Sequence, residues 1–338
     1  MPVSILTNAS ALAEYDLRVR LSPQGTLWQS LTRKKYVEAC GKQTRIYVTS
    51  GQPDSGLAGK PQTSALVIID RTAGGFSTWE IPRGPLWSGQ RAAGSGQPTD
   101  ILLERIIEDA KRERCLVLYF SPQIPLSADR FPLIASPRHI HCEATRMIDL
   151  TLPEEQLLAQ MHPKGRYNIS VARKHGVTVR EGSADDIESF YKLLKTTGER
   201  DGFVVSQKSH YRRFLTDLEG SFILMAEYAK KPIAGLIGVR WGTTGFYYYG
   251  ASSYDSRQLM APYLLQWEAM KLCKAAGCTK YDLLGIATDP TDKNDPWAGI
   301  TDFKRKFGGS VVSYPPEQMM VLRPLAYKAL ELKRRLFG

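Results

Sequence analysis

The apolar residues of this chain recur with the periods expected of helices and strands. Over residues 98–113 they follow helical spacing after the start signal Pro98-Thr99-Asp100, which predicts an amphipathic helix. Residues 10–40 predict two helices separated by a turn that contains proline and glycine. Segments rich in β-branched and aromatic residues predict strands at 44–50, 64–71, 76–81 and 115–120. The first part of the chain is therefore predicted to mix helices with strands.

The part of the chain after residue 151 repeats this plan. A strand ends at residue 151 and Pro153 begins a new helix, so we predict one domain over residues 1–151 and a second over residues 152–338. Helices are expected at 153–175, 184–200, 207–217, 260–276, 300–306 and the basic C-terminus, and strands at 177–181, 221–228, 232–241, 245–251 and 279–284. Two successive units of this kind predict an α+β (mixed α/β) protein that arose by duplication.

Composition agrees with two packed domains. The 338 residues exceed the usual size of one domain, and 43% are hydrophobic and 23% charged, as in ordinary globular proteins. The formal net charge of +11 favours a polyanionic partner, such as a nucleic acid, an anionic membrane surface or a phosphorylated substrate. Charge alone ranks these partners and does not choose among them.

The five cysteines indicate a reducing compartment. They form no C-x-x-C pair, and Cys115 lies in an apolar run where a free thiol behaves as a small hydrophobic residue. Near the start of the chain, charged residues such as Glu14 and Arg18 stand where a signal peptide would have an apolar core. No apolar run approaches the ~20 residues that span a bilayer. We therefore expect a cytoplasmic protein, with the membrane surface as a second expected location.

Two histidines raise the question of a metal site. His139 and His141 alternate along a strand-like segment, so they could face one side as two ligands would. Zinc takes three or four nitrogen, sulfur or oxygen ligands from a protein, and no further ligand stands at a complementary spacing. We therefore predict no metal site.

Residues 161–176, MHPKGRYNISVARKHG, carry only positive formal charge. No carboxylate occurs between Glu155 and Glu181, and the cations of the segment are Lys164, Arg166, Arg173 and Lys174. A solvated helix face normally mixes both signs of charge, so this segment indicates a compensating anion. The alternative is a basic helix exposed to solvent, and composition does not decide between the two.

The same segment resembles the central motif of the FemABX family, the non-ribosomal peptidyltransferases that add amino acids from aminoacyl-tRNA to the stem peptide of peptidoglycan precursors. Further stretches match in the family's order, at residues 22–35, 247–252 (YYYGAS), 261–266 (APYLLQ), 281–285 (YDLLG) and 303–309 (FKRKFGG). The resemblance implies two tandem GNAT-like acyltransferase domains, the first on the acceptor side and the second on the donor side. Residues 185–217 leave no room for the helical arm of longer members, so the chain looks like the short FemX-like type.

The resemblance also implies roles for single residues. Lys304 matches the family lysine that stabilises negative charge on the reacting carbonyl oxygen, and a preorganised donor of this kind contributes about 3–4 kcal/mol. Lys35 stands where the family has a lysine that contacts carrier phosphates, and Arg83 lies in a turn towards the substrate cleft. The full set of substrate-binding candidates is Lys35, Arg83, Ser206, His210, Tyr247, Tyr249 and Phe303.

Some of these candidates have a second interpretation. Tyr247 and Tyr249 alternate along a strand, so we expect their side chains to share a face, where they line the acceptor cleft or pack in the core. Phe303 belongs to a helix that turns aromatic residues towards the core, with Lys304 beside that face. At positions 206 and 210 the sequence departs from the short-type relative, which has an arginine and a tyrosine there. The form of the acceptor therefore stays open.

The expected donor is aminoacyl-tRNA, and we expect no cofactor. A CoA-dependent GNAT enzyme holds the pyrophosphate on backbone N–H groups of a glycine-containing loop before a helix. Here Met260 replaces the glycine, and Pro262 has no N–H. The cations expected to bind tRNA phosphates are Lys164, Arg166, Arg173, Lys174 and Lys306. The basic residues 333–335 could bind the tRNA as well, or touch anionic lipid.

These observations predict a monomeric, aminoacyl-tRNA-dependent transferase that adds an amino acid to a UDP-linked or lipid-linked muramyl peptide. Two alternatives stay open. One keeps the donor and takes a small-molecule or secondary-metabolite amine as the acceptor. The other is a non-catalytic module that binds RNA or the inner membrane surface. The matched motifs offer no general base, so the amine either arrives neutral or gives its proton to the substrate.

Overall fold

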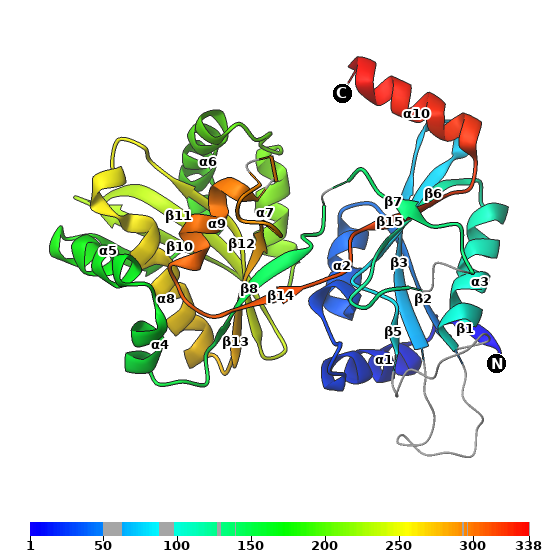
Figure 1. The fold of residues 1–338 in the computed structure, drawn as a ribbon, viewed down its shortest axis with the longest axis horizontal. Helices are drawn as coiled ribbons and strands as arrows, with labels where there is room; N and C mark the ends of the chain where they lie inside the picture. Colours follow the sequence, from blue (N-terminus) through cyan, green and yellow to red (C-terminus); the bar gives the residue numbers. More distant parts are fainter. Residues whose placement is uncertain are drawn as a thin grey trace. The chain divides into compact units, whose positions relative to one another are not determined.

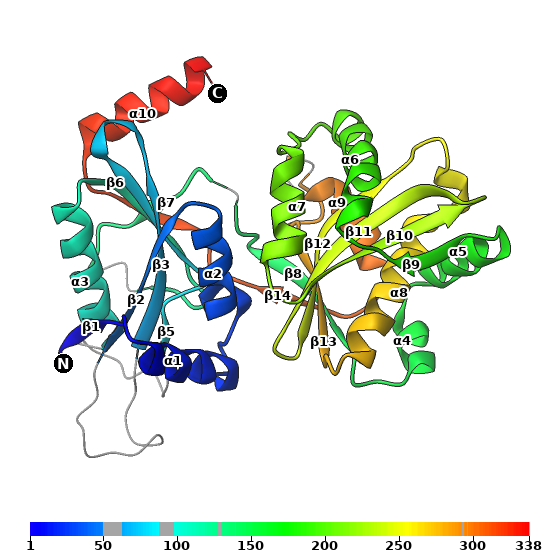
Figure 2. The same ribbon diagram turned by 180° about the vertical axis from the view of Figure 1, so that it is seen from behind.

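The structure is a computed structural model that describes residues 1–49, 63–87, 98–126, 130–138, 140–292, 294–295 and 297–337, without the side chains of Ala73 and residues 333–337. The chain folds into two units, Met1–His141 together with Tyr314–Gly338, and Cys142–Ser313. Each unit has its own sheet with helices packed against it (Figures 1 and 2), which confirms the predicted mixed α/β class. No helix in the described ranges is both long and apolar enough to cross a bilayer.

The division between the units differs from the boundary expected at residue 151. Strand β8 (Ala144–Asp149) pairs with β13 (Lys280–Ile286) and with β14 (Ser310–Ser313), so it belongs to the sheet of the second unit. The later strand β15 (Gln318–Val321) pairs with β6 (Cys115–Ser121) of the first unit. Pairing between distant strands therefore sets the division, and the helix start after residue 151 does not.

The first unit is a sheet with strand order β1-β2-β3-β4-β6-β15-β7, and β5 pairs with β3. β4 and β6 run parallel. Its other elements are β1 (Val3–Ile5), α1 (Ala9–Leu21), the 3₁₀ helix η1 (Leu27–Gln29), α2 (Leu31–Ala39), β2 (Gln43–Thr49), β3 (Thr63–Arg71), the 3₁₀ helix η2 (Ala73–Gly75), β4 (Ser77–Pro82), β5 (Leu86–Trp87), α3 (Pro98–Arg112), β7 (Ile134–Ala135) and α10 (Pro324–Phe337). Leu102 and Ile106 of α3 pack against Trp79 and Leu118 in the main core of this unit.

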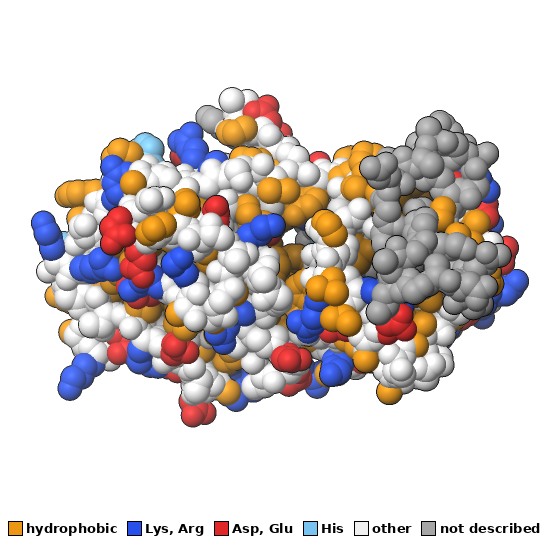
Figure 3. Space-filling model, turned by 90° about the horizontal axis from the view of Figure 1, so that it is seen from below, with side chains coloured by type: hydrophobic (Ala, Val, Ile, Leu, Met, Phe, Trp, Pro, Cys, Tyr) orange, Lys and Arg blue, Asp and Glu red, His pale blue; other side chains and the backbone are white. Residues whose placement is uncertain are grey.

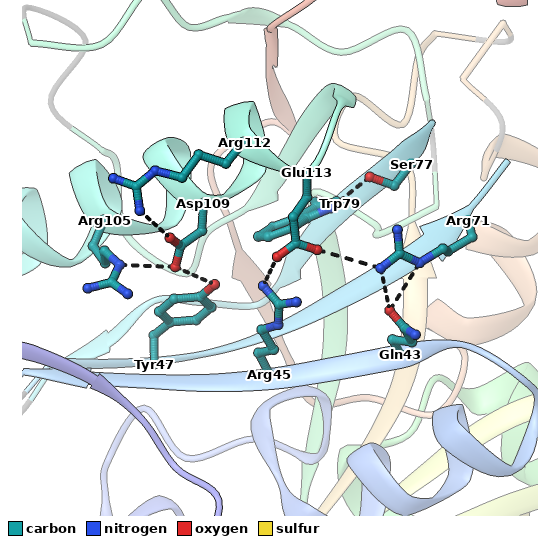
Figure 4. A network of polar contacts seen from close by, with 10 residues as sticks. All are labelled: Gln43, Arg45, Tyr47, Arg71, Ser77, Trp79, Arg105, Asp109, Arg112 and Glu113. Atoms are coloured by element: carbon teal, nitrogen blue, oxygen red, sulfur yellow. Dashed lines mark hydrogen bonds and ion pairs between the residues drawn. The ribbon is translucent and has the colours of Figure 1, made fainter. Parts of the chain in front are cut away.

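Polar contacts add to the apolar contacts of helix α3 (Figure 4). Asp109 accepts hydrogen bonds from the Tyr47 hydroxyl at 3.1 Å and from Arg105 Nε at 3.0 Å. Glu113, just after the helix, forms an ion pair with Arg45 of strand β2. The helix predicted over residues 98–113 is thus held on the sheet by its apolar stripe and by the acidic residues near its end.

The second unit has strand order β14-β8-β13-β12-β11-β10-β9. Its other elements are α4 (Glu154–Gln160), α5 (Pro163–Lys174), β9 (Thr178–Glu181), the 3₁₀ helix η3 (Ala184–Asp186), α6 (Ile187–Asp201), α7 (Lys208–Asp217), β10 (Ser221–Tyr228), β11 (Lys231–Trp241), β12 (Thr244–Ser252), the 3₁₀ helix η4 (Arg257–Leu259), α8 (Ala261–Ala275) and α9 (Ala298–Arg305). Helices α5 and α8 cover one face of this sheet, and α6 and α7 cover the other (Figures 1 and 2).

Strands β12 and β13 position the candidate site. They run parallel and pair at three positions near their starts, from Thr244 with Lys280 to Phe246 with Asp282. β12 then continues to Ser252, and β13 continues to Ile286. Beyond the paired positions, side chains from a neighbouring element can reach both strands. Helix α9, which packs on β13, supplies such a side chain.

Candidate active site

The candidate site centres on Lys304 of helix α9. The residue is 4% exposed, and its Nζ donates a hydrogen bond of 2.6 Å to the carbonyl oxygen of Gly285 on β13. Two aromatic rings flank the same ammonium group, with ring centroids at 5.7 Å for Tyr247 and 5.6 Å for Trp297. The carbonyl partner and the two rings therefore restrict where the ammonium group of this buried lysine can lie.

A bulge in strand β13 presents the carbonyl partner of Lys304. From Asp282 to Gly285 the strand advances three residues, while the partner strand β8 advances two. The extra residue is accommodated at Leu284, which has a φ of +55°. Asp282 fixes this conformation because it accepts hydrogen bonds from the Leu284 N–H at 2.8 Å and from the Thr145 hydroxyl. The sequence motif YDLLG thus forms the bulge that presents the Gly285 carbonyl to Lys304.

Burial changes the acidity of Lys304. Loss of hydration lowers the pKa of its ammonium to about 8, although the nearby Cys142 and Asp282 act in the opposite direction. At pH 7 a lysine with this pKa is still protonated in about nine molecules of ten. The site therefore holds a cation at neutral pH, and that cation becomes neutral within a mildly alkaline range.

The aromatic residues next to Lys304 pack as the sequence indicated. Phe307 is fully buried, and Phe303 is half-buried with its ring centroid 5.1 Å from that of Phe307 and 5.2 Å from that of Tyr263. The core-facing interpretation of this helix therefore agrees with the structure, and Lys304 lies beside the aromatic face. A contact of Phe303 with substrate remains a prediction.

Tyr247 and Tyr249 do not share a face, and that part of the prediction is wrong. The alternation is broken by a bulge, because Tyr247 pairs with Gly238 of β11 while Tyr249 pairs with the adjacent Ile237. Neighbouring residues of a strand point to opposite faces, so the extra residue at Tyr248 turns the two hydroxyls apart. Tyr247 packs against the core that contains helix α8, and Tyr249 turns to helix α7.

Tyr249 forms a separate polar cluster with His210. The His210 Nε2 lies 2.9 Å from the Tyr249 hydroxyl, and the ring of Tyr211 packs edge-on against both. Ser206 is exposed just before helix α7, and its backbone N–H donates to the Tyr211 hydroxyl at 3.2 Å. The structure therefore brings Ser206, His210 and Tyr249 together, on the opposite face of β12 from Tyr247.

The basic segment forms helix α5, and its charges are partly compensated within the protein. Arg166 donates to the carbonyl of Met161 beyond the end of helix α4, and Arg173 forms an ion pair of 3.3 Å with Glu268 of helix α8. The carboxylate that the local sequence lacks is thus supplied from another helix. Lys164 and Lys174 are exposed. On the face drawn in Figure 3, basic and acidic side chains are interspersed and form no single basic patch.

Helix α5 nevertheless lies directly against the end of the helix that carries Lys304. The backbone N–H of His162 donates to the carbonyl of Lys306 at 3.1 Å. A Cβ at Gly165 would come within 2.5 Å of the same oxygen, so only glycine permits this approach. The half-buried Lys306 and the N-terminus of α5 therefore belong to one neighbourhood with Lys304.

The remaining candidates belong to the first unit. Lys35 is exposed on helix α2. Arg83 is only 5% exposed, has a φ of +50°, and lies with its guanidinium carbon 3.8 Å from the ring centroid of Tyr314. Gln29 supports this turn because its side-chain amide donates to the Pro82 carbonyl at 2.6 Å. Tyr314 thus packs against the guanidinium of Arg83, and Gln29 supports the backbone just before it.

Of the two histidines that raised the question of a metal, the structure describes His141. His139 lies outside the described residues, and the His141 Nε2 is 2.8 Å from Glu80. Burial alone would raise the pKa of Glu80, but the hydrogen bond to His141 and the charge of Arg138 outweigh it and hold the pKa at about 2. Among the described residues, no group of three or more His, Cys, Asp or Glu is placed to hold a metal ion.

Sequence reasoning missed the residues that shape the surroundings of Lys304. Trp297 precedes helix α9, and its ring lies over Gly285, where a Cβ would come within 2.5 Å of the indole. Asp282 locks the bulge through its backbone and side-chain partners. The only sequence signal for these roles was Gly285 directly after the predicted strand 279–284. The bulge and the position of the indole depend on residues that are distant in the chain.

Comparisons with known proteins agree with this arrangement. The sequence model of the FemAB family matches residues 134–229 and 218–335. The UDP-N-acetylmuramoylpentapeptide-lysine N(6)-alanyltransferase of Weissella viridescens is 25% identical over 317 residues, which cover 86% of this chain and 89% of that protein. The lipid II:glycine glycyltransferase of Staphylococcus epidermidis is 24% identical over 266 residues. That match covers 60% of this chain, and the chain spans 64% of the length of this relative.

Solved structures share the fold. The crystal structure of FemX superposes with a TM-score of 0.78 at 18% sequence identity and covers 98% of this chain and 100% of that one. A tandem GNAT protein from the clavulanic acid biosynthesis pathway superposes with a TM-score of 0.54 at 11% identity, over 95% of this chain and 98% of that one. These likenesses confirm the predicted tandem GNAT-like architecture.

Proposed function

The chain belongs to the FemAB family, and from that premise we propose that it is an aminoacyltransferase that extends the stem peptide of a peptidoglycan precursor. Two relatives support this activity by their names, one a glycyltransferase for lipid II and the other an alanyltransferase for the lysine of UDP-N-acetylmuramoylpentapeptide. The proposed donor is an aminoacyl-tRNA. The single observation that carries the proposal is the confined ammonium group of Lys304 where β12 and β13 stop pairing.

The proposed reaction is aminolysis of an ester. The free amine of the acceptor attacks the carbonyl carbon of the aminoacyl group and forms the new C–N bond. Negative charge gathers on the carbonyl oxygen, the C–O bond to the terminal ribose breaks, and the proton lost by the amine ends on the ribose hydroxyl. The chain has to supply a donor aimed at the carbonyl oxygen, since the amine is itself the nucleophile.

Lys304 is the residue proposed for that task. An ammonium has three N–H donors, and Gly285 accepts from one, so the others can bind a substrate oxygen. Because the group is buried, its interaction with a developing negative charge is stronger than it would be in water. A preorganised donor of this kind contributes about 3–4 kcal/mol to the transition state. Tyr247 and Phe303 flank the lysine and are proposed to contact the substrate.

For the acceptor we propose a nucleotide-linked muramyl peptide. The relative that acts on a UDP-linked precursor aligns over 89% of its length, whereas the relative that acts on lipid II aligns over 64%. Lys35 and Arg83 of the first unit are proposed to bind the phosphates of the carrier, since both are cations and the guanidinium of Arg83 packs against an aromatic ring. In the second unit, the cluster of Ser206, His210 and Tyr249 is proposed to bind polar groups of a substrate.

For the donor we propose that tRNA phosphates lie along helix α5. Lys164 and Lys174 are exposed on this helix, and Arg166 and Arg173 add to its positive charge. The contact of the helix N-terminus with the Lys306 carbonyl supports this path, because it puts the basic helix next to the helix of Lys304. Such contacts give affinity that falls with salt and depends little on sequence.

The test is a transfer assay with purified charged tRNA and three acceptors, namely the UDP-linked precursor, the lipid-linked precursor and a small amine. We expect the UDP-linked precursor to gain one aminoacyl group, detected by mass spectrometry, and Lys304→Met to lower the rate by about 10²–10³-fold. Lys195→Met is the control, since Lys195 is exposed on α6. Consumption of charged tRNA with the small amine alone would overturn the acceptor, and no loss of activity in Lys304→Met would overturn the mechanism.

We further propose that the protein works in the cytoplasm as a monomer and reaches the membrane surface only when its acceptor is lipid-linked. The excess of positive charge in the sequence supports contact with an anionic surface. Sedimentation velocity of the protein alone tests the first part. Sedimentation with anionic vesicles that contain or lack a lipid-linked acceptor tests the second. A dimer in solution, or tight vesicle binding without a lipid-linked acceptor, would contradict them.

A further inference from the structure

The environment of Lys304 contains an aromatic residue that the proposed chemistry has not yet used. The indole of Trp297 has its ring centroid 5.6 Å from the Lys304 Nζ, at nearly the same distance as the ring of Tyr247. Trp297 is half-buried, and Gly285 is the residue directly beneath its ring. The indole thus touches both the cation and the residue whose carbonyl binds that cation.

The position of Trp297 is fixed by its backbone. Its N–H donates to the Asp295 carboxylate at 2.7 Å, and the other oxygen of that carboxylate accepts from the Thr288 N–H at 3.1 Å. The Thr301 hydroxyl donates to the Trp297 carbonyl at 2.7 Å and accepts from the Ala287 N–H at 2.8 Å. Hydrogen bonds therefore hold the backbone of Trp297 at its N–H and at its carbonyl, which limits how far the indole can move.

We infer that Trp297 is a positioning residue for the proposed transfer reaction, because its indole and the ring of Tyr247 confine the ammonium of Lys304 at the Gly285 carbonyl and direct its remaining N–H groups to the substrate. This inference rests on the proposed function of Lys304. A buried ammonium has lost most of its hydration, and the negative faces of aromatic rings replace part of it. Rings achieve this without offering a carboxylate, which would compete with the substrate oxygen for the same N–H donors.

Other charged or titratable groups also act on Lys304. Asp282 on β13 and Cys142 both favour its charged form, and burial opposes them. The hydroxyl of Tyr247 has a pKa raised to about 12, chiefly because the group is buried, so it stays neutral over the range of interest. None of these groups changes when Trp297 is replaced. A change in the titration of Lys304 on replacement of the indole therefore reports on the indole itself.

The test compares Trp297→Leu with Trp297→Phe. Leucine fills space without a π face, so the cation loses that interaction while water stays excluded, and phenylalanine keeps a smaller π face. The readout is the ¹³Cε shift of Lys304 against pH in lysine-labelled protein, with the signal assigned by its absence in Lys304→Met. We expect the midpoint to fall by about 0.5–1 pH unit in the leucine variant and by less in the phenylalanine variant.

Transfer rates across pH provide the second readout. If the midpoint falls by about one unit, the leucine variant should be about fivefold slower than the natural sequence at pH 8 and nearly equal to it at pH 6.5. A purely structural role would lower the rate by the same factor at every pH. Tyr254→Leu is the control, since Tyr254 is an exposed aromatic residue that packs on Arg257 and should leave both profiles unchanged.

The outcomes separate this inference from the function on which it rests. A midpoint in Trp297→Leu that stays constant or rises overturns the inference, because a rise would mean that hydration and not the ring governs the cation. Normal activity in Lys304→Met overturns the proposed role of Lys304, and no transfer by the natural sequence overturns the proposed function. Both results are read from other proteins than Trp297→Leu. Should Trp297→Leu fail to fold, as judged by its thermal melt, the phenylalanine variant provides the same test with a smaller expected shift.

Discussion

Replacing Lys304 with methionine should remove the transfer activity and at the same time stabilise the protein. The folded state holds this ammonium with a pKa of about 8 against a reference value of 10.5. A difference of about 2.5 units corresponds to about 3 kcal/mol by which the charged form is disfavoured in the folded state at pH 7. Methionine fills similar space without charge but leaves the Gly285 carbonyl without this partner, which costs about 1–2 kcal/mol. The net gain should be about 1–2 kcal/mol.

The sign of the pH dependence follows from the lowered pKa. Below pH 8 the lysine is charged in both the folded and the unfolded state, so the full penalty is present. Between pH 8 and 10.5 the folded protein releases the proton while the unfolded chain still holds it, so stability rises with pH. The advantage of Lys304→Met should therefore be constant below pH 8 and shrink through this window. Above pH 10.5 it should reverse, because only the loss of the partner of the Gly285 carbonyl remains.

The assay is urea unfolding of both proteins at pH 7, 9 and 10.5, followed by fluorescence. Other groups titrate in this range as well, but they are common to both proteins, so the difference between the two free energies of unfolding isolates Lys304. Lys195→Met should differ from the natural sequence by less than about 0.5 kcal/mol at pH 7. A Lys304→Met protein that is less stable at pH 7, or a difference that does not change with pH, would refute the reasoning.

Three further predictions follow from other parts of the structure. The pKa of Glu80 is held at about 2 against a reference of 4.5, so the stabilisation by its carboxylate is complete above pH 4.5 and is lost as the pH falls towards 2. The free energy of unfolding of Glu80→Gln, measured in urea at pH 3 and 6, should lack this dependence on pH. Gly220→Ala should cost more than about 2 kcal/mol in thermal or urea unfolding, since φ is +86° and the new Cβ would lie 2.1 Å from a carbonyl oxygen, whereas Gly277→Ala, with φ of +85° and open space around it, should cost about 1 kcal/mol. Log affinity for charged tRNA falls with log salt, and replacing both Lys164 and Lys174 with glutamine should make this negative slope shallower by about 2. Filter binding between 50 and 200 mM salt measures the slope. An unchanged slope would contradict the proposed donor path.

The sequence was informative where structure depends on local periodicity. The helix predicted over residues 98–113 is α3, and the strand predicted over 115–120 is β6, because apolar spacing and strand-forming side chains act over a few residues. The aromatic face of the helix at Phe303 was readable for the same reason. The burial of Lys304 was not, since a lysine on an amphipathic helix is normally exposed and only its three-dimensional neighbours decide otherwise.

The failures share one physical cause, which is dependence on a partner that is distant in the sequence. The bulge at Tyr248 turns the side chain of Tyr249 to the face of the sheet opposite the predicted one. The bulge itself is set by the register of β12 against β11. The bulge at Leu284 likewise depends on β8. The positive charge of α5 looked uncompensated because Glu268, the partner of Arg173, lies 95 residues away in the sequence. No local pattern of residues records such pairings.

The interleaved order of the two units has a consequence for synthesis on the ribosome. All of the second unit lies in one continuous stretch, Cys142–Ser313, so it can fold as soon as that stretch has emerged. The first unit begins earlier but lacks β15 until residues 318–321 are made, and until then the edge of β6 lacks one of its partners. The half whose synthesis starts first is therefore the half that is finished last, and in the interval its open edge can pair with another chain.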